Sequence, residues 1–335
     1  MRESVKINAS IDVGKTPFIL LLAGIMMLTA VSGPLADRIS HAAEQSAPLI
    51  NINIYDSVML SQQKYLMVGE RGEIYFSEDS GANWQSAKSA TKNNLFSVSF
   101  AGAQNGWACG ALGTMLHTSD GGRTWAEQNS GTEKHLFAVD FYDTRNGCAV
   151  GDWGTILRTT DGGTTWEDAT LSEDIILYGI CLTQSHEGWA VGEFGQLFQT
   201  RDLGKTWQKF QSPAIQSLFT ICGEGESLYA AGLDGAIIYS HDNGETWEES
   251  SNLSGKSIYG IDVAGQTCWA VGEEGTVLRS DDSGKSWKSL DVPMQARLFW
   301  FGAISIKMKN STSIGFGAGA HGVMFRIQDS ALLWD

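Results

Sequence analysis

Residues 147–166 decide the fold, and they read GCAVGDWGTILRTTDGGTTW. The stretch joins two phrases: a glycine-bounded turn within residues 147–157, and an aspartate–glycine turn that ends in Trp166. Both phrases recur along the chain at a constant offset from one another. The sequence is therefore an internal repeat of about 40 residues, a length typical of propeller blades and helical arrays.

The aspartate–glycine phrase occurs six times intact. Its final tryptophans are 41, 41, 41, 40 and 40 residues apart. The copies read SEDSGANW (77–84), TSDGGRTW (118–125), TTDGGTTW (159–166), TRDLGKTW (200–207), SHDNGETW (240–247) and SDDSGKSW (280–287). A seventh glycine-bounded turn, FGAGAHGVMF (316–325), is followed by a degenerate copy in which Ala331 replaces the glycine. The sequence therefore predicts seven units.

Each unit is predicted to hold four short strands, separated by clusters of Gly, Asn and Asp. In the second unit these are Leu95–Phe100, Gly106–Gly110, Thr114–Thr118 and Thr124–Gln128. The first strands share an apolar alternation: LFSVSF (95–100), LFAVDF (136–141), LYGICL (177–182), LFTICG (218–223), IYGIDV (258–263) and LFWFGA (298–303). A four-stranded unit this short cannot bury both faces alone, so the units must stack into a closed ring.

The predicted fold class is all-β: a seven-bladed β-propeller of four-stranded blades with Asp-box turns, spanning residues 44–335. The glycine-rich, proline-poor composition agrees, with 39 glycines and 5 prolines. Two ways of closing the ring stay open. Either the last unit supplies its own outer strand through Leu332–Asp335, or residues near 45–50 pair there instead.

The aspartate–glycine phrase has a structural explanation. An aspartate that opens a tight turn accepts backbone N–H bonds, the glycine supplies left-handed backbone, and the tryptophan covers the blade edge. We interpret these aspartates as structural, not as calcium ligands or catalytic groups, because they recur once per blade around the ring. They are Asp79, Asp120, Asp161, Asp202, Asp242 and Asp282.

Turns of this form resemble the Asp boxes, or bacterial neuraminidase repeats, of sialidases, other glycosidases and sorting receptors. The longer pattern, G-W-A-V-G-x-x-G-x-[IL] followed by [RST]-T-x-D-G-G-x-T-W, is carried by residues 188–207 and 147–166. It resembles the photosystem II stability/assembly factor family from about residue 50 to 335. The resemblance implies a non-enzymatic helper, without cofactor, that binds a membrane-protein subunit or assembly intermediate. The same propeller could instead serve another envelope partner in a non-photosynthetic bacterium.

Five side chains are candidates for binding the partner. The assembly-factor family is noted for arginines gathered on one face of the ring, and the position before the box Ser/Thr here holds Arg158, Arg279 and Arg326. The alternative is that these arginines only pair with nearby carboxylates. Trp153 and Phe194 are aromatic where a loop is normally polar, which favours partner contact.

Acidic residues gather in the loop after the second strand of each unit. They are Glu70, Asp152, Glu193, Asp234, Glu273 and Glu274. Two interpretations stay open: a channel mouth that favours a cationic segment, or a solvated rim. The net charge is −15, and −16 without residues 1–43, which argues against a nucleic-acid partner. We expect a monomer that contacts membranes only through an N-terminal anchor.

No pair of cysteines has metal-ligand spacing, so no metal site is predicted. Cys181 and Cys222 occupy equivalent positions in adjacent first strands. A disulfide between them and buried free thiols are the two alternatives. No catalytic residue is predicted either, because units of 40–41 residues leave no long inserted loop to carry the paired carboxylates of a glycosidase. An Asp-box glycosidase is the enzyme alternative to the assembly factor.

Residues 1–43 are predicted to be a signal peptide or a membrane anchor. Arg2, Lys6 and Lys15 precede an apolar run, Phe18–Val31, that is short for a bilayer span. His41-Ala42-Ala43 provides an A-x-A-like cleavage site before Glu44. Cleavage, and an uncleaved anchor within residues 18–35, both stay open. In either case we expect export to the periplasm or the thylakoid lumen.

Overall fold

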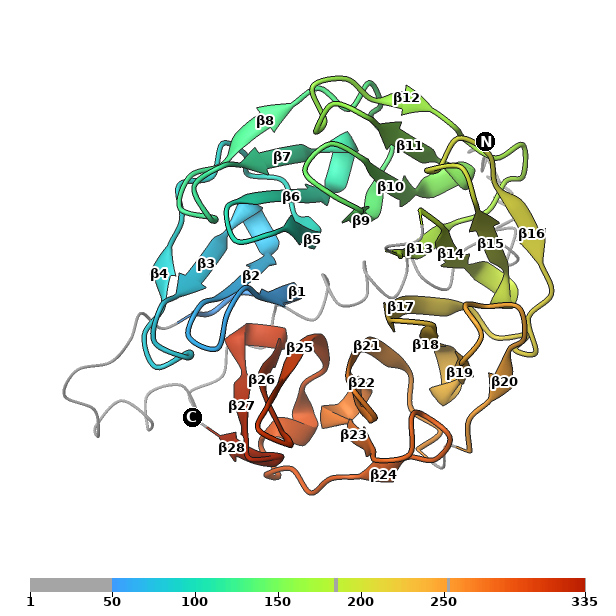
Figure 1. Cartoon of the computed structure of the whole chain (residues 1–335). Coiled ribbons are helices and arrows are strands. Elements are labelled where there is room, and N and C mark those ends of the chain that lie inside the picture. Colours follow the sequence, from blue (N-terminus) through green and yellow to red (C-terminus); the bar gives the residue numbers. More distant parts are fainter. Residues whose placement is uncertain (1–49, 184–185, 252–253, 335) are drawn as a thin grey trace, which may run out of the picture. The chain divides into compact units, whose positions relative to one another are not determined.

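The structure, a computed structural model, describes residues 50–183, 186–251 and 254–334. This part of the chain forms seven four-stranded antiparallel sheets arranged around a central axis (Figure 1). Its helical elements are three-residue 3-10 turns, and none is long or apolar enough to cross a membrane. The predicted seven-bladed propeller is confirmed. The predicted signal or anchor segment, residues 1–43, lies outside the described residues.

Each blade runs outward from the axis in chain order. The innermost strands are β1 (Ile54–Met59), β5 (Leu95–Ala101), β9 (Leu136–Phe141), β13 (Leu177–Leu182), β17 (Leu218–Glu224), β21 (Ile258–Ala264) and β25 (Phe301–Lys309). The second strands are β2 (Tyr65–Gly69), β6 (Asn105–Gly110), β10 (Gly147–Gly151), β14 (Gly188–Gly192), β18 (Ser227–Gly232), β22 (Thr267–Gly272) and β26 (Thr312–Gly319).

The outer half of each blade is shorter. The third strands are β3 (Ile74–Ser77), β7 (Met115–Thr118), β11 (Ile156–Thr159), β15 (Leu197–Thr200), β19 (Ile237–Ser240), β23 (Val277–Ser280) and β27 (Met324–Gln328). The outermost strands are β4 (Gln85–Ser86), β8 (Ala126–Gln128), β12 (Glu167–Asp168), β16 (Gln208–Phe210), β20 (Glu248–Glu249), β24 (Lys288–Ser289) and β28 (Ala331–Trp334). The four strands predicted in the second unit match β5–β8 to within two residues.

One innermost strand was placed wrongly by the sequence pattern. Residues 298–303 continue the aromatic alternation, yet β25 begins only at Phe301, and Ala296–Leu298 forms the 3-10 turn η8. The pairing explains the offset. Phe301 lies opposite Gly319, just as Leu136 lies opposite Gly151 in the third blade. The glycine that ends the second strand therefore fixes where the innermost strand begins.

The core is divided among the seams between blades. One cluster joins Leu66 and Val68 of the first blade to Leu95, Ala108 and other residues of the second. The second strands β2, β10 and β14 are buried along their whole length, because neighbouring blades cover both faces. Each fully buried aliphatic or aromatic side chain contributes about 1.5–3 kcal/mol. The seams thus supply the burial that a single blade cannot.

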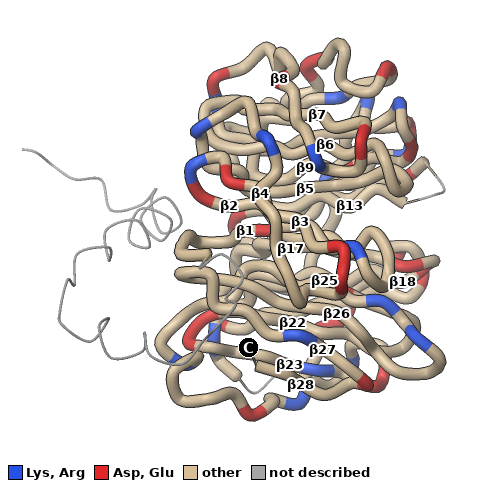
Figure 2. The backbone as a smooth tube through the Cα atoms, turned by 90° about the vertical axis from the view of Figure 1, so that its left-hand side faces the viewer, with Lys and Arg blue, Asp and Glu red and all other residues tan. Residues whose placement is uncertain are grey.

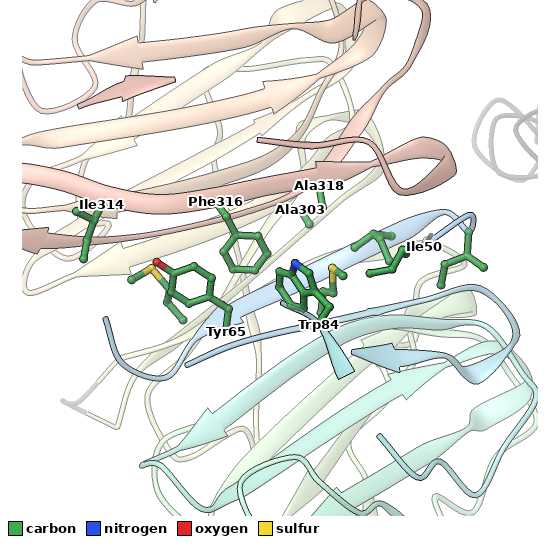
Figure 3. Packing of buried hydrophobic residues seen from close by; sticks show 11 residues of the cluster. Ile50, Tyr65, Trp84, Ala303, Ile314, Phe316 and Ala318 are labelled. Atoms are coloured by element: carbon green, nitrogen blue, oxygen red, sulfur yellow. The ribbon is translucent and has the colours of Figure 1, made fainter. Parts of the chain in front are cut away.

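The last blade supplies its own outermost strand, because β28 pairs with β27. This is the first of the two alternatives for closing the ring; of the residues near 45–50, only Ile50 lies within the described part of the chain. The lead-in residues Ile50 and Ile52 do not pair there, and pack instead between the first and last blades. Around them Tyr65 and Trp84 of the first blade meet Phe316 and Ala318 of the last (Figure 3). In residues 50–334, as far as the structure describes them, the first and last blades meet by side-chain packing.

The degenerate seventh box forms a different turn. Asp329 and Ser330 have φ values of 50° and 64°, and β27 and β28 pair directly on either side of them, Gln328 opposite Ala331. Two central residues with positive φ are the signature of a two-residue hairpin. Loss of the box glycine has therefore shortened the turn without interrupting the blade.

Candidate functional site

The propeller has two faces with different chemistry. The box face carries the Asp boxes, which connect the third and fourth strands. The tip face carries the turns between the second and third strands. These turns are η2 (Glu70–Gly72), η3 (Ala111–Gly113), η4 (Asp152–Gly154), η5 (Glu193–Gly195), η6 (Leu233–Gly235), η7 (Glu273–Gly275) and η9 (Ala320–Gly322). Basic and acidic residues alternate over the edge of the ring and form no single-sign block in this view (Figure 2).

On the box face, the aspartates are fully engaged in their own turns. Asp120 accepts the N–H groups of Arg123 and Thr124 at 3.0 Å each, and hydroxyl bonds from Thr118 at 2.8 Å and Thr124 at 2.7 Å. Burial raises the pKa of Asp120, but the hydrogen bonds from Thr124 and Thr118 outweigh it and lower the pKa to about 2. The remaining five aspartates accept the N–H four residues ahead at 2.8–2.9 Å.

The box also joins neighbouring blades. Gly244 has φ of +86°, and a Cβ placed there would lie 2.1 Å from the buried ring of Trp189 in the preceding blade. In the same way, the indole of Trp107 donates to the Gly162 carbonyl of the next box at 2.9 Å. The glycine is needed both for the left-handed turn and for this close approach.

The three predicted arginines each lie against the box of the following blade. Arg158 donates to the Leu203 carbonyl at 2.9 Å and pairs with Glu167 at 2.6 Å. Arg279 donates to the Ser330 carbonyl at 3.0 Å. Arg326 lies beside Gly81, where a Cβ would be 3.5 Å from its Cδ. The structure therefore places them at three separate seams of the box face, in contacts within the propeller. Their partner-binding role stays a prediction.

The tip face is built from strained positions. The middle residue of each turn has left-handed backbone, with φ between 50° and 57°. These residues are Arg71, Leu112, Trp153, Phe194, Asp234, Glu274 and His321. Left-handed backbone disfavours any side chain other than glycine, asparagine or aspartate. The tips are basic in the last and first blades, apolar in the second to fourth, and acidic in the fifth and sixth.

Both predicted aromatic residues, Trp153 and Phe194, stand at tips. A third exposed apolar tip, Leu112, was not predicted. Trp153 is 59% exposed, Phe194 66% and Leu112, in the preceding blade, 60%. Ile215 is also exposed, and it follows Ala214, whose carbonyl lies against the η5 glycine. We call Leu112, Trp153, Phe194 and Ile215 the apolar arc. The repeat itself could have identified Leu112, because Leu112 in GALG (110–113) is equivalent to Trp153 in GDWG (151–154) and Phe194 in GEFG (192–195).

The acidic residues after the second strands divide into two groups. Glu70, Asp152, Glu193 and Glu273 accept backbone N–H groups from residues that lead into the innermost strand of the same blade, at 3.0–3.3 Å. These four carboxylates are structural. Asp234 and Glu274 stand at tips instead, and Glu274 pairs with Lys256 at 2.5 Å. Neither a continuous acidic mouth nor a wholly solvated rim describes the arrangement.

Seven aromatic rings surround the axis near the tip face. We call them the collar: Tyr55, Phe96, Phe137, Tyr178, Phe219, Tyr259 and Trp300. Six stand at the second position of an innermost strand. The seventh blade has Gly302 at that position, and Trp300 fills the space. Each ring contacts both neighbours, with centroids 5.4–6.3 Å apart, so the collar is closed. The sequence pattern did not predict the collar.

Within the collar lies a channel of about 410 Å³, lined by the innermost strands. Three carboxylates face it. Asp56 accepts the Val98 N–H at 2.8 Å, Asp140 the Leu182 N–H at 2.8 Å and Asp262 the Ile306 N–H at 2.7 Å, each across a blade seam. Burial raises the pKa of Asp56 to about 6 and that of Asp262 to about 7, and it raises the pKa of Asp140. All five cysteines are free thiols, including the neighbours Cys181 and Cys222.

The fold and its turns define an Asp-box, seven-bladed β-propeller. Residues 37–130 and 123–215 match the family described as photosynthesis system II assembly factor YCF48. Together these matches span more than half of the 335 residues, and the chain belongs to this family. Residues 189–313 also match a family described as the DUF6242 beta propeller domain. Comparison with the curated proteins found no match.

Solved structures with the same fold include two of the YCF48 type. One, described as YCF48 bound to D1 peptide, has 20% identity and a TM-score of 0.66, over 87% of this chain and 94% of that one. YCF48 from Cyanidioschyzon merolae has 21% identity and a TM-score of 0.63, over 84% and 96%. The GH74 xyloglucanase from Xanthomonas campestris has 13% identity and a TM-score of 0.70, over 87% of this chain and 55% of the enzyme. These likenesses are of fold.

Proposed function

We propose that this chain is a non-catalytic, exported assembly or stability factor that binds a segment of a photosystem-like membrane-protein subunit. Membership of the YCF48 family supports the class of function. A solved propeller of the same fold, described as bound to D1 peptide, supports a polypeptide ligand. The regular units support the absence of catalysis, because the longest connection between strands in the described residues is residues 290–300, between β24 and β25.

The observation that carries the proposal is the apolar arc. Three consecutive blades hold Leu112, Trp153 and Phe194 in left-handed backbone, with most of each side chain in water. Left-handed backbone costs about 1 kcal/mol for a side chain of this kind. In the free protein these exposed side chains contribute no burial energy that would offset this cost. Exposed apolar side chains at the same position of three neighbouring blades mark a candidate protein-binding surface. The partner segment therefore presents apolar side chains to the tip face.

The experiment is affinity capture from detergent-solubilised membranes of the source organism, with tagged full-length protein as bait. The wild type is expected to recover a photosystem subunit or its precursor. A triple variant, Leu112→Ser, Trp153→Ser and Phe194→Ser, is expected to lose at least about 90% of it, equivalent to 1.4 kcal/mol of binding free energy. The matched control, Met308→Ser with Leu333→Ser, removes exposed apolar side chains outside the arc and should bind normally.

A second arm tests the predicted arginines. Arg158→Ala, Arg279→Ala and Arg326→Ala together should leave capture intact if the tip face binds the partner, and abolish it if the box face does. The thermal midpoint is recorded for each variant, because these arginines also contact the following blade. Recovery of another envelope protein in place of a photosystem subunit would identify the alternative partner. Hydrolysis of xyloglucan by the purified protein would contradict the non-catalytic proposal.

A further inference from the structure

The charges that line the channel are of one sign. Its charged lining residues are Asp56, Asp140 and Asp262, and no lysine, arginine or histidine is among the described residues that line it. Asp140 raises the pKa of Asp56 and Asp56 raises that of Asp262, after the larger effect of burial. The carboxylates thus repel one another across a cavity that holds no counter-charge. A cation entering the channel would be attracted by all three.

One polar group in the channel wall takes no part in the hydrogen bonds that join neighbouring blades. Ser57 stands beside Asp56, is 7% exposed and lines the same cavity, yet its hydroxyl has no partner. Buried polar groups are nearly always hydrogen-bonded. The hydroxyl of Ser57 is therefore an unsatisfied buried polar group in the wall of the channel.

The collar determines what can reach these groups. A seven-sided ring with sides of 5.4–6.3 Å places each aromatic centroid roughly 7 Å from the axis. An α-helix with side chains is about 10–12 Å across, too wide once the thickness of the rings is subtracted. A single side chain or an extended segment fits. Aromatic rings also attract cations and pack against aliphatic stems.

A bare metal ion is a poor match for this arrangement. The three carboxylates come from the first, third and sixth blades, and the described residues contain no group of three His, Cys, Asp or Glu side chains that converges on one point. A metal ion needs several ligands within about 2–2.6 Å. A spread of negative charge behind an aromatic collar suits an organic cation, whose charge is diffuse and whose stem is apolar.

We infer that the channel, entered through the collar on the tip face, binds an organic cation with an aliphatic stem: the lysine or arginine side chain of an extended polypeptide segment. The stem contacts the collar rings, and the ammonium or guanidinium group approaches the carboxylates. The inference goes beyond the proposed function, since it names a second recognition site, separate from the apolar arc, and holds whichever protein supplies the segment.

The test uses full-length protein labelled with 5-fluorotryptophan, with the Trp300 fluorine signal assigned by Trp300→Phe. Acetyl-Gly-Gly-Lys-Gly-Gly-amide is titrated against the same peptide with norleucine in place of lysine. The lysine peptide is expected to shift the Trp300 signal saturably and to bind at least about tenfold more tightly than its neutral counterpart. Binding should weaken at least about tenfold from pH 8 to pH 5, because the channel carboxylates take up protons while the lysine stays charged.

Variants locate the site. Asp140→Asn should weaken the lysine peptide severalfold, and Asp168→Asn, an exposed carboxylate on the outermost strand β12, should not. Asp140 also holds the Leu182 N–H, so Tyr259→Leu provides a second variant that opens the collar and keeps every carboxylate. Butylammonium binding as tightly as the peptide would support the cation site and assign it to a free amine. Equal binding of the norleucine peptide, an unmoved Trp300 signal, or affinity independent of pH would overturn the inference, whatever the capture experiment yields.

Discussion

The box aspartates and the channel aspartates use the same side chain in opposite electrostatic settings. Asp120 and Asp262 both accept backbone N–H groups on the carboxylate, yet the pKa of Asp120 is about 2 and that of Asp262 about 7. The box lies at the water-facing edge, where hydrogen bonds dominate. The channel wall is enclosed by seven strands, where desolvation dominates and hydrogen bonds only moderate it. The comparison shows that the number of hydrogen bonds alone does not set the pKa of an aspartate in this fold; burial of the carboxyl also decides it.

The largest expected effect concerns the contact between an Asp box and the neighbouring blade. Gly244→Ala should destabilise the propeller by about 3 kcal/mol, from left-handed strain plus the clash with Trp189. Gly225→Ala is the matched control, because it has φ of +62° and nothing within 4 Å of the added methyl group. It should cost only about 1 kcal/mol. Urea unfolding of both variants measures the difference, and equal losses would show that the box is only a turn.

The next effect separates an intact box from the degenerate one. Asp120→Ala removes four hydrogen bonds and should cost about 2 kcal/mol at pH 7. Asp329 holds the same slot in the seventh blade, but its hairpin needs no carboxylate to accept its N–H groups. Asp329→Asn, which keeps a side chain that tolerates the left-handed backbone at φ of 50°, should change the free energy of unfolding by less than about 0.5 kcal/mol. A large loss at Asp329 would mean that the seventh turn is a box after all.

The sequence predicts the boxes and the blades well because both depend on local chemistry. Glycine, aspartate and tryptophan at fixed spacing specify each turn, and seven turns specify the ring. The collar escaped prediction because its seventh ring, Trp300, precedes the strand whose equivalent position is Gly302. The channel carboxylates escaped because Asp56 is the third residue of its strand, whereas Asp140 and Asp262 are the fifth. Contacts across seams, such as Arg158 to Leu203, have no sequence signature at all.

The pH dependence of stability should separate the two kinds of aspartate. The folded pKa of Asp262 is raised from 3.8 to about 7, so its charge destabilises the fold at pH 8, and this penalty is relieved as pH falls from 7 towards 4. Asp262→Asn should reduce this gain in the free energy of unfolding between pH 7 and pH 4 by about 1–2 kcal/mol, after allowance for solvent in the channel. Asp120 acts in the opposite sense, and only between pH 4 and 2, because its stabilising charge is lost as pH falls through its folded pKa. Denaturant titrations at each pH distinguish the range in which Asp262 acts from that in which Asp120 acts. An unchanged pH dependence of stability in Asp262→Asn would contradict the raised pKa of Asp262.

The smallest expected effect concerns the apolar arc. We expect its side chains to contribute nothing to the stability of the propeller. Trp153→Asn replaces an exposed indole with a residue that tolerates left-handed backbone, so the fold should gain up to about 0.5 kcal/mol. Met294→Asn is the control, because Met294 is also exposed, at 81%, but has no positive φ, and its replacement should leave the free energy of unfolding unchanged. A gain at Trp153 alone means that the free propeller carries strain at a position whose side chain is useful only to a partner. A loss of 1 kcal/mol or more would mean that the indole stabilises the blade itself, and the tip face would then have to bind through other residues.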